Sequence, residues 1–253
     1  MPQASLDLAR YQELAPRNLE YDRQEKAYIA TSHFSPVMTS GDPQGYLDEL
    51  LGLAVEVLPR ELSFVGWSPP IGVTRYPSRR VEAFILRHVL QAIRRKRTLF
   101  IQYQSMNRPV ASTRKISPHA IAFDGFRWHT RAFCHEHNDF RDFLFSRILG
   151  LSGEEASTVN PEHDTSWIRT IDLVLVPHPN LSAGQRRSIE LDYGMENGRV
   201  VLRTREALLF YVLRHLDLDQ RARDTPQAMQ IQLANREDLD PLLEQIARKL
   251  TPQ

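Results

Sequence analysis

The chain has 253 residues, of which 42% are hydrophobic and 25% charged, which suits two or three small domains with ordinary cores. Its 32 basic residues nearly balance 31 acidic ones, which excludes a basic field over the whole protein, so a polyanion site must be a local cluster. A single cysteine, Cys134, excludes an internal disulfide and a cysteine-based zinc site. With neither a signal-peptide pattern nor a membrane-length apolar run, we expect a cytoplasmic protein.

The first predicted elements are a short helix and a two-stranded ribbon. Apolar residues at helical spacing predict the helix over residues 2–14. After Pro16, two apolar-rich segments flank the polar stretch 22–26, which predicts a hairpin with Arg23 and Lys26 at its tip. This arrangement is typical of the second half of a winged helix-turn-helix. The pattern alone favours a different interpretation, an amphipathic helix and hairpin packed on a larger domain.

The next region is helical, then irregular, then helical again. Asp42 and Pro43 predict a helix start, with an N-cap followed by proline. Residues 59–80 contain four prolines and predict a connection. Residues 81–97 place apolar side chains on one broad helical face. Solvation and the helix dipole explain the basic C-terminal end of this helix better than phosphate binding does.

Residues 98–151 are rich in β-strand signals. Residues 99–105 alternate between two faces, and residues 141–151 predict a further strand. Between two apolar runs, Asp124 and Gly125 predict a hairpin with a type I′ turn. Short strands so closely spaced predict a small barrel rather than an open sheet.

The C-terminal part alternates between strands and helices. Strands are predicted at 171–176, 198–204 and 228–234, and helices at 182–192, 205–216 and 236–250. This alternation indicates a compact α+β domain.

The β-rich segment also carries an unusual set of basic, hydroxyl and aromatic side chains. Arginine grips phosphate through a planar fork, hydroxyls and histidines add directional hydrogen bonds, and aromatic neighbours can stack on bases. Because few acidic residues lie nearby in the sequence, an anion-binding surface is favoured over strand arginines that are paired with acids. We expect the basic side chains to gather into one phosphate-sized pocket. The set consists of Tyr103, Ser105, Arg114, His119, Arg127, His129, Arg131, Arg141 and Arg147.

Catalytic and metal-binding interpretations are weaker. His135, Glu136 and His137 are adjacent, so their side chains would point apart, and the spacing of a zinc-binding helix is missing. Cys134 lies beside His135 but has no third group that would orient the pair. The sequence contains no phosphate-binding loop and no nucleophile elbow. We therefore predict that the protein is not an enzyme and uses no metal or cofactor.

Residues 99–148 resemble a WYL domain, a small Sm-like or SH3-like β-barrel of bacterial regulators. The name-giving Trp-Tyr-Leu triplet reads Trp128-His129-Thr130 here. The other landmarks are IQYQS at 101–105, KISPHAI at 115–121, RWHTRAFC at 127–134 and RDFLFSRI at 141–148.

The predicted domain order resembles the regulators of phage-defence operons of the CapW/BrxR type along almost the whole chain. The resemblance implies an α+β protein with four parts. These are a partial winged helix-turn-helix at 1–38, a helical linker at 39–80, the WYL domain at 81–155 and a ferredoxin-like (WCX-type) dimerisation domain at 165–253.

The resemblance also implies a function. Such regulators are homodimeric, ligand-responsive repressors that bind double-stranded operator DNA, and some respond to nucleic acid. Carried over by position, the ligand pocket would hold a nucleic-acid-derived ligand against Tyr103, Ser105, Arg114, His119, His129, Arg131, Arg141 and Arg147.

The N-terminal end departs from the family pattern. In these regulators a segment similar to PQAS opens the recognition helix after two further helices, whereas this sequence begins there. We expect Gln3, Ser5 and Arg10 to meet the major groove, and Arg23 and Lys26 to contact phosphates. Without the two supporting helices, we predict that the chain dimerises but binds operator DNA poorly. The alternative is a non-catalytic nucleic-acid-binding accessory protein that uses only its WYL surface.

Overall fold

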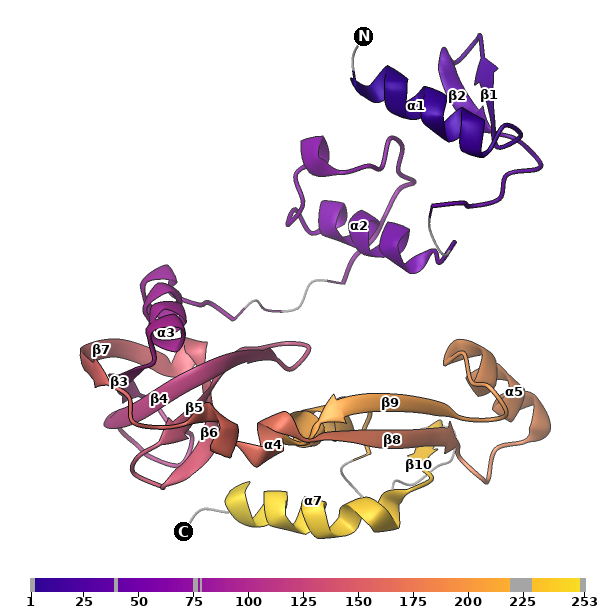
Figure 1. Cartoon of the computed structure of the whole chain (residues 1–253). Helices are drawn as coiled ribbons and strands as arrows, with labels where there is room; N and C mark the ends of the chain where they lie inside the picture. Colours follow the sequence, from indigo (N-terminus) through magenta and orange to yellow (C-terminus); the bar gives the residue numbers. More distant parts are fainter. Residues whose placement is uncertain (1–2, 39–40, 75–76, 78, 219–228, 251–253) are drawn as a thin grey trace. The chain divides into compact units, whose positions relative to one another are not determined.

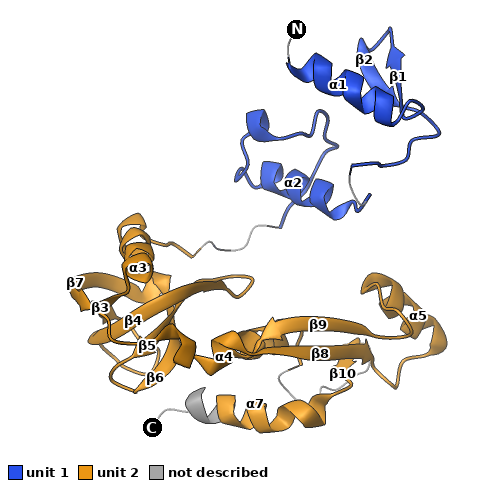
Figure 2. Cartoon of the chain, viewed as in Figure 1, with its two compact units in different colours: residues 1–77 blue, residues 78–253 orange. Residues whose placement is uncertain are grey.

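The computed structural model describes residues 3–38, 41–74, 77, 79–218 and 229–250, the last four of these as backbone alone. The chain divides into two compact units, residues 1–77 and 78–253 (Figure 2). Pro2 and Ala228, each the first residue of a predicted element, lie outside the described residues. No helix among the described residues combines the length and the apolar character that crossing a bilayer requires.

The first unit begins with the predicted helix and hairpin. Helix α1 spans Gln3–Leu14, and strands β1 (Leu19–Asp22) and β2 (Ala27–Ala30) pair antiparallel. The carboxylate of Asp22 accepts hydrogen bonds from the backbone N–H groups of Gln24 and Glu25, at 2.7 and 3.1 Å. These bonds hold the tip of the hairpin, and helix α1 itself contains no buried residue.

The rest of the first unit is built on helix α2 (Gln44–Ala54) and the short 3-10 helix η1 (Arg60–Leu62). The helix starts one residue later than predicted, because Pro43 occupies the N-cap position. Asp42 still supports the start, since its carboxylate accepts the Gln44 N–H at 2.9 Å. Leu50 is buried on the inner face of α2.

The second unit begins with helix α3 (Ala83–Arg95), which packs on a five-stranded sheet (Figure 1). Ile85, Val89 and Ala92 form the buried stripe of the helix, as the 3.6-residue period predicts. Leu90 was expected on the same face but is 43% exposed, because it lies at the border of that stripe. The helix ends at Lys96, whose left-handed backbone turns the chain into the sheet.

The sheet is antiparallel, with the strand order β6-β5-β4-β3-β7. The strands are β3 (Arg97–Tyr103), β4 (Ser112–Phe123), β5 (Trp128–Cys134), β6 (Asp139–Leu144) and β7 (Ile148–Ala156). The order leaves β6 and β7 at opposite ends, and no pairing joins them within 139–156, all of which is described. The expected closed barrel is therefore not found.

Two local predictions in this sheet were wrong. The strand predicted over 141–151 is split by the 3-10 helix η2 (Phe145–Arg147), because Phe145 turns inward and is only 1% exposed. The predicted type I′ turn needs two residues with positive φ, whereas in the turn after β4 only Gly125 has one, at +93°. Instead, the Asp124 carboxylate accepts the N–H groups of Phe126 and Arg127, at 2.9 and 2.7 Å.

The C-terminal part follows the 3-10 helix η3 (Pro161–His163) and the short helix α4 (Thr165–Ile168). Its three antiparallel strands lie in the order β10-β8-β9, with α7 running alongside them (Figure 1). Apolar residues of three helices pack against these strands. The predicted alternation is confirmed. A ferredoxin-like domain runs β-α-β-β-α-β, an order that the described residues do not follow. The elements are β8 (Thr170–Pro177), α5 (Ala183–Asp192), β9 (Val200–Arg205), η4 (Glu206–Leu208), α6 (Leu209–His215), β10 (Ile231–Leu233) and α7 (Arg236–Leu250).

Candidate functional site

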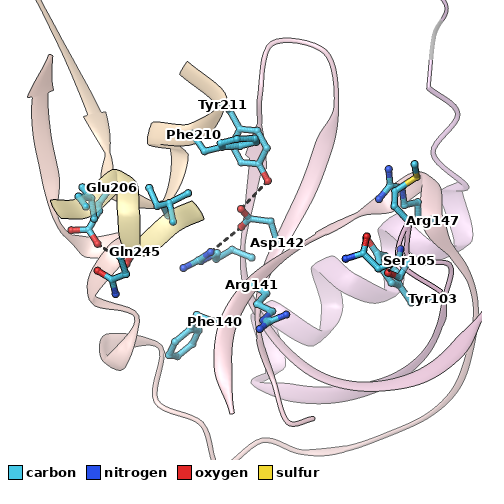
Figure 3. A pocket seen from close by; sticks show the side chains of 17 residues that line it. Tyr103, Ser105, Phe140, Arg141, Asp142, Arg147, Glu206, Phe210, Tyr211 and Gln245 are labelled. Carbon is cyan, nitrogen blue, oxygen red and sulfur yellow. Dashed lines mark hydrogen bonds and ion pairs between the residues drawn. The ribbon is translucent and has the colours of Figure 1, made fainter. Parts of the chain in front are cut away.

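A cavity of about 400 Å³ lies between the five-stranded sheet and the C-terminal part of the second unit (Figure 3). Figure 3 shows Tyr103, Ser105 and Arg147 on the side of the sheet, with Glu206 and Gln245 on the opposite side. The lining residues are Tyr103, Ser105, Met106, Asn107, Arg131, Phe140, Arg141, Asp142, Arg147, Ser166, Glu206, Ala207, Phe210, Tyr211, Leu242, Gln245 and Ile246.

Two of the predicted arginines, Arg141 and Arg147, line this cavity without an acidic partner among the described residues. The Nε of Arg141 is buried and has no hydrogen-bond partner there. Burial, and after it the nearby charge of Arg141, lowers the pKa of His137. The Arg141 guanidinium therefore acts electrostatically on this side of the cavity. A buried donor without a partner carries a desolvation cost.

Ser105 and Tyr103, two more of the predicted pocket residues, line the cavity with these arginines. The Tyr103 ring is buried and meets Phe143 edge to face, with 5.1 Å between ring centroids. Its hydroxyl oxygen accepts the Leu144 N–H at 3.3 Å, so its own proton remains available for a ligand. Two hydroxyl donors therefore accompany the two unpaired arginines, a donor set that suits phosphate oxygens.

Arg131 also lines the cavity, but it is neutralised by two acids. Its Nε and Nη2 donate to the carboxylate of Asp164 at 2.7 and 3.0 Å, and its Nη1 donates to Asp142 at 3.2 Å. Asp142 in turn accepts the Tyr211 hydroxyl at 3.1 Å, and Figure 3 shows these two side chains pointing toward each other. Arg131 thus joins strands β5 and β6 to α4 and α6, and the expectation that it is free to bind an anion was wrong.

The other three predicted residues lie outside the cavity, so the expectation of one pocket for all the basic side chains was also wrong. His119 Nε2 lies 2.9 Å from Asp164, on the wall of a second cavity of about 70 Å³. The buried His129 has its Nε2 2.9 Å from Asp124. Arg114 is buried against Glu136 in an ion pair. An acidic neighbour holds each of them away from the cavity.

Arg127, the remaining basic residue of the set, donates from its Nε to the Asp124 carboxylate at 2.8 Å. Asp124 therefore serves both Arg127 and His129, and these bonds outweigh the effect of burial and lower the pKa of Asp124. Among the described residues, no group of three His, Cys, Asp or Glu side chains is placed to hold a metal ion.

Comparisons with known proteins bear on the whole chain. Its sequence matches the models of three domain families. These are the BrxR transcriptional regulator winged helix-turn-helix domain over residues 1–52, the WYL domain over 85–152, and the BrxR transcriptional regulator C-terminal dimerization domain over 170–239.

Curated relatives also match over almost the whole chain. The chain is 39% identical over 246 residues to the DNA-binding transcriptional repressor CapW of Escherichia coli strain KTE188, which covers 97% of this chain and 82% of the relative. It is 43% identical over 240 residues to CapW of Stenotrophomonas maltophilia, with 94% and 80% covered. The chain belongs to the CapW/BrxR family of WYL-domain transcriptional regulators.

The three domains that the CapW/BrxR-family chain matches are regulatory rather than catalytic. The cavity lies where the WYL part meets the C-terminal part. A solved structure of proteasome accessory factor B/C of Arthrobacter aurescens overlaps with a TM-score of 0.30 at 16% identity, over 67% of this chain and 27% of that one. That overlap is too loose to inform the fold.

Several lining residues of this CapW/BrxR-family site were missed by sequence reasoning. Glu206 is buried and accepts hydrogen bonds from Ser166 Oγ at 2.7 Å and from Arg169 Nη1 at 3.0 Å. Phe210 and Gln245 come from α6 and α7. No local pattern marks these residues, since only the packing of the C-terminal part on the sheet brings them to the cavity.

Asp164 makes stability depend on pH in the acidic range. Burial alone would raise its pKa, but hydrogen bonds from His119 and Arg131 outweigh that effect and lower the pKa from 3.8 to about 2. The unfolded chain therefore takes up the proton first as the pH falls, so the stabilisation is complete above 3.8 and disappears as the pH falls through about 2. We expect Asp164 to contribute about 2 kcal/mol at neutral pH.

Urea unfolding of the wild type and of Asp164→Asn at several pH values between neutral and 2 checks this. The stability difference between the two proteins should shrink across the window, while the separate dependence caused by Asp124, whose pKa is also lowered, persists in both. A difference that is constant with pH would contradict the assignment.

Proposed function

We propose that this protein is a homodimeric DNA-binding transcriptional repressor, cytoplasmic and acting on a phage-defence operon, that responds to a ligand in the cavity of its second unit. The family and the printed names of the CapW relatives support the repressor function. The match to a dimerization domain supports the homodimer. The match to a winged helix-turn-helix favours this function over that of an accessory protein that uses its WYL surface alone.

The observation that carries ligand sensing is the basic end of the cavity. Neither Arg141 nor Arg147 has an acidic partner among the described residues, and both line the cavity with the hydroxyl group of Ser105. The rings of Phe140 and Phe210 also line the cavity and offer faces for a base. A nucleic-acid-derived ligand combines these two chemistries, with phosphate for the arginines and a base for the aromatic rings.

The DNA-binding surface that we propose is α1 together with the hairpin tip. Gln3, Ser5 and Arg10 are exposed on α1, and Arg23 and Lys26 are exposed at the tip. In a winged helix-turn-helix the recognition helix enters the major groove while neighbouring basic side chains contact phosphates. Because α1 has no buried residue, its side chains are free to meet bases.

A gel shift on the promoter of the protein's own gene tests this function. We expect a weak, salt-sensitive shift of the promoter that still exceeds the shift of unrelated DNA, and we expect short single-stranded DNA or a cyclic nucleotide to change it. Arg10→Ala should weaken the shift without changing the binding of those probes. Equal shifts on promoter and unrelated DNA would contradict the repressor, and a shift that no probe alters would contradict ligand sensing.

A further inference from the structure

The three-stranded sheet of the C-terminal part has one face covered by helices and one open face. On the covered face, Leu173, Leu175 and Ile231 are buried against residues of α5, α6 and α7. Strand alternation sends the neighbouring residues of β8, among them Val174, to the other face. The short helix α4 reaches this face only at the Arg205 end of β9, and Val201, the register partner of Val174, is 51% exposed.

The open face combines an apolar strip with one exposed ion pair. Val174 and Val176 of β8 and Val201 of β9 form the strip. Arg203 lies opposite Asp172 and binds its carboxylate through two hydrogen bonds, from Nε at 2.7 Å and from Nη2 at 3.0 Å. The face therefore presents one ion pair of an acid and a base next to the apolar strip, with Arg205 farther along β9.

The charges on this face already have partners within the chain. Asp172 and Arg203 satisfy each other, and the Arg205 guanidinium lies 4.6 Å from the centroid of the Trp167 ring and donates to the Trp167 carbonyl oxygen. Burying the face would not leave an isolated charge, the main cost of covering a charged surface. The face can therefore be buried in an interface.

The pattern of the open face is self-complementary. In a two-fold symmetric contact the same patch meets itself, so a residue of one copy faces a different residue of the other. If the axis passes near Val201, the apolar strips of two copies meet, and each Asp172 can face the Arg203 of the other copy. The match to a dimerization domain covers residues 170–239 and so includes this whole sheet.

We propose that the open face of the sheet, centred on Val201, is the surface on which a second copy of the chain docks through a two-fold contact. This inference rests on the homodimer of the proposed function and adds the surface that forms it. The acid and the base then form an alternating group of four charges across the axis. Sheets that pack face to face in this way interdigitate their side chains.

A charge-swap experiment tests the pairing between copies. Asp172→Arg replaces the ion pair by two bases and Arg203→Asp replaces it by two acids, so self-association of each variant should weaken at least tenfold in analytical ultracentrifugation. An equimolar mixture of the two should form a heterodimer, because the basic face of one meets the acidic face of the other. Mixing cannot restore the pair within a chain, so recovery would report contact between copies. Both charges are exposed, so each variant should keep the wild-type thermal midpoint.

A crosslinking experiment locates the axis. The native Cys134 is buried and is the only cysteine, so Val201→Cys adds the one accessible thiol. A short bis-maleimide should link two copies of this variant. Leu149→Cys, at a position 63% exposed on β7, is the matched control and should stay unlinked.

The surface is wrong if both charge variants dimerise like the wild type, if their mixture stays monomeric, or if Val201→Cys remains unlinked in a dimeric sample. These results would place the second copy on another part of the chain. A wild-type chain that sediments as a monomer would instead contradict the homodimer of the proposed function.

Discussion

Replacing Arg131 with alanine should lower the free energy of unfolding of the second unit by about 3–5 kcal/mol, because it leaves buried charges without a partner. Arg131 is the only cation that bonds to both Asp142 and Asp164 among the described residues. Asp164 is 2% exposed and would keep His119 and the backbone N–H of Trp167 as partners, neither of which supplies the charge of a guanidinium. Asp142 would keep only the Tyr211 hydroxyl among the bonds seen here.

Urea unfolding followed by tryptophan fluorescence measures this loss, since Trp128 and Trp167 both lie in the second unit. Arg187→Ala is the matched control, because that side chain is 68% exposed and its ion pair with Glu190 lies on the surface of α5. The control should leave the midpoint nearly unchanged, since exposed pairs contribute little. Arg131→Lys keeps the charge but loses the planar fork, and should fall between the two. Equal midpoints for Arg131→Ala and the control would show that the hydrogen bonds of Arg131 to Asp142 and Asp164 do not stabilise the second unit.

Much of the fold could be predicted from local patterns. Helix α3 was predicted from the 3.6-residue period of its apolar residues, and the strands and helices of the C-terminal part from their alternation. The failures have physical causes. Phe145 turns into the core and breaks the strand predicted over 141–151. The burial of this ring depends on tertiary packing, which the alternation of apolar and polar residues along the sequence does not reveal.

The site was only partly predictable, for a related reason. Strand alternation put His129 and Arg131 on one face, but the acids that bind them come from elsewhere in the fold. Asp164 lies outside the β-rich segment whose acids were considered, although its position as the N-cap of α4 is a local signal. Arg141 and Arg147 do line the cavity, and their part in ligand binding stays a prediction. The cavity residues of α6 and α7 could not be predicted, because these helices reach the cavity only through the packing of the C-terminal part on the sheet.

Replacing Arg141 with methionine should weaken the binding of a phosphate-bearing ligand by about tenfold to a hundredfold. A hydrogen bond from a charged group is worth about 1.5–3 kcal/mol, and 1.4 kcal/mol corresponds to about a tenfold change in affinity. Methionine keeps an unbranched apolar stem and removes a buried Nε that has no partner among the described residues. The thermal midpoint of the variant should therefore be equal to or higher than that of the wild type.

Isothermal titration of a short single-stranded DNA oligonucleotide into the wild type, Arg141→Met and Arg187→Met measures this directly. Arg187→Met removes the same charge from an exposed site on α5 that does not line the cavity, and so separates local binding from a change in net charge. We predict that the wild type and Arg187→Met bind equally and that Arg141→Met binds at least tenfold more weakly. Equal affinities for all three proteins, or no binding by the wild type, would contradict phosphate recognition in the cavity.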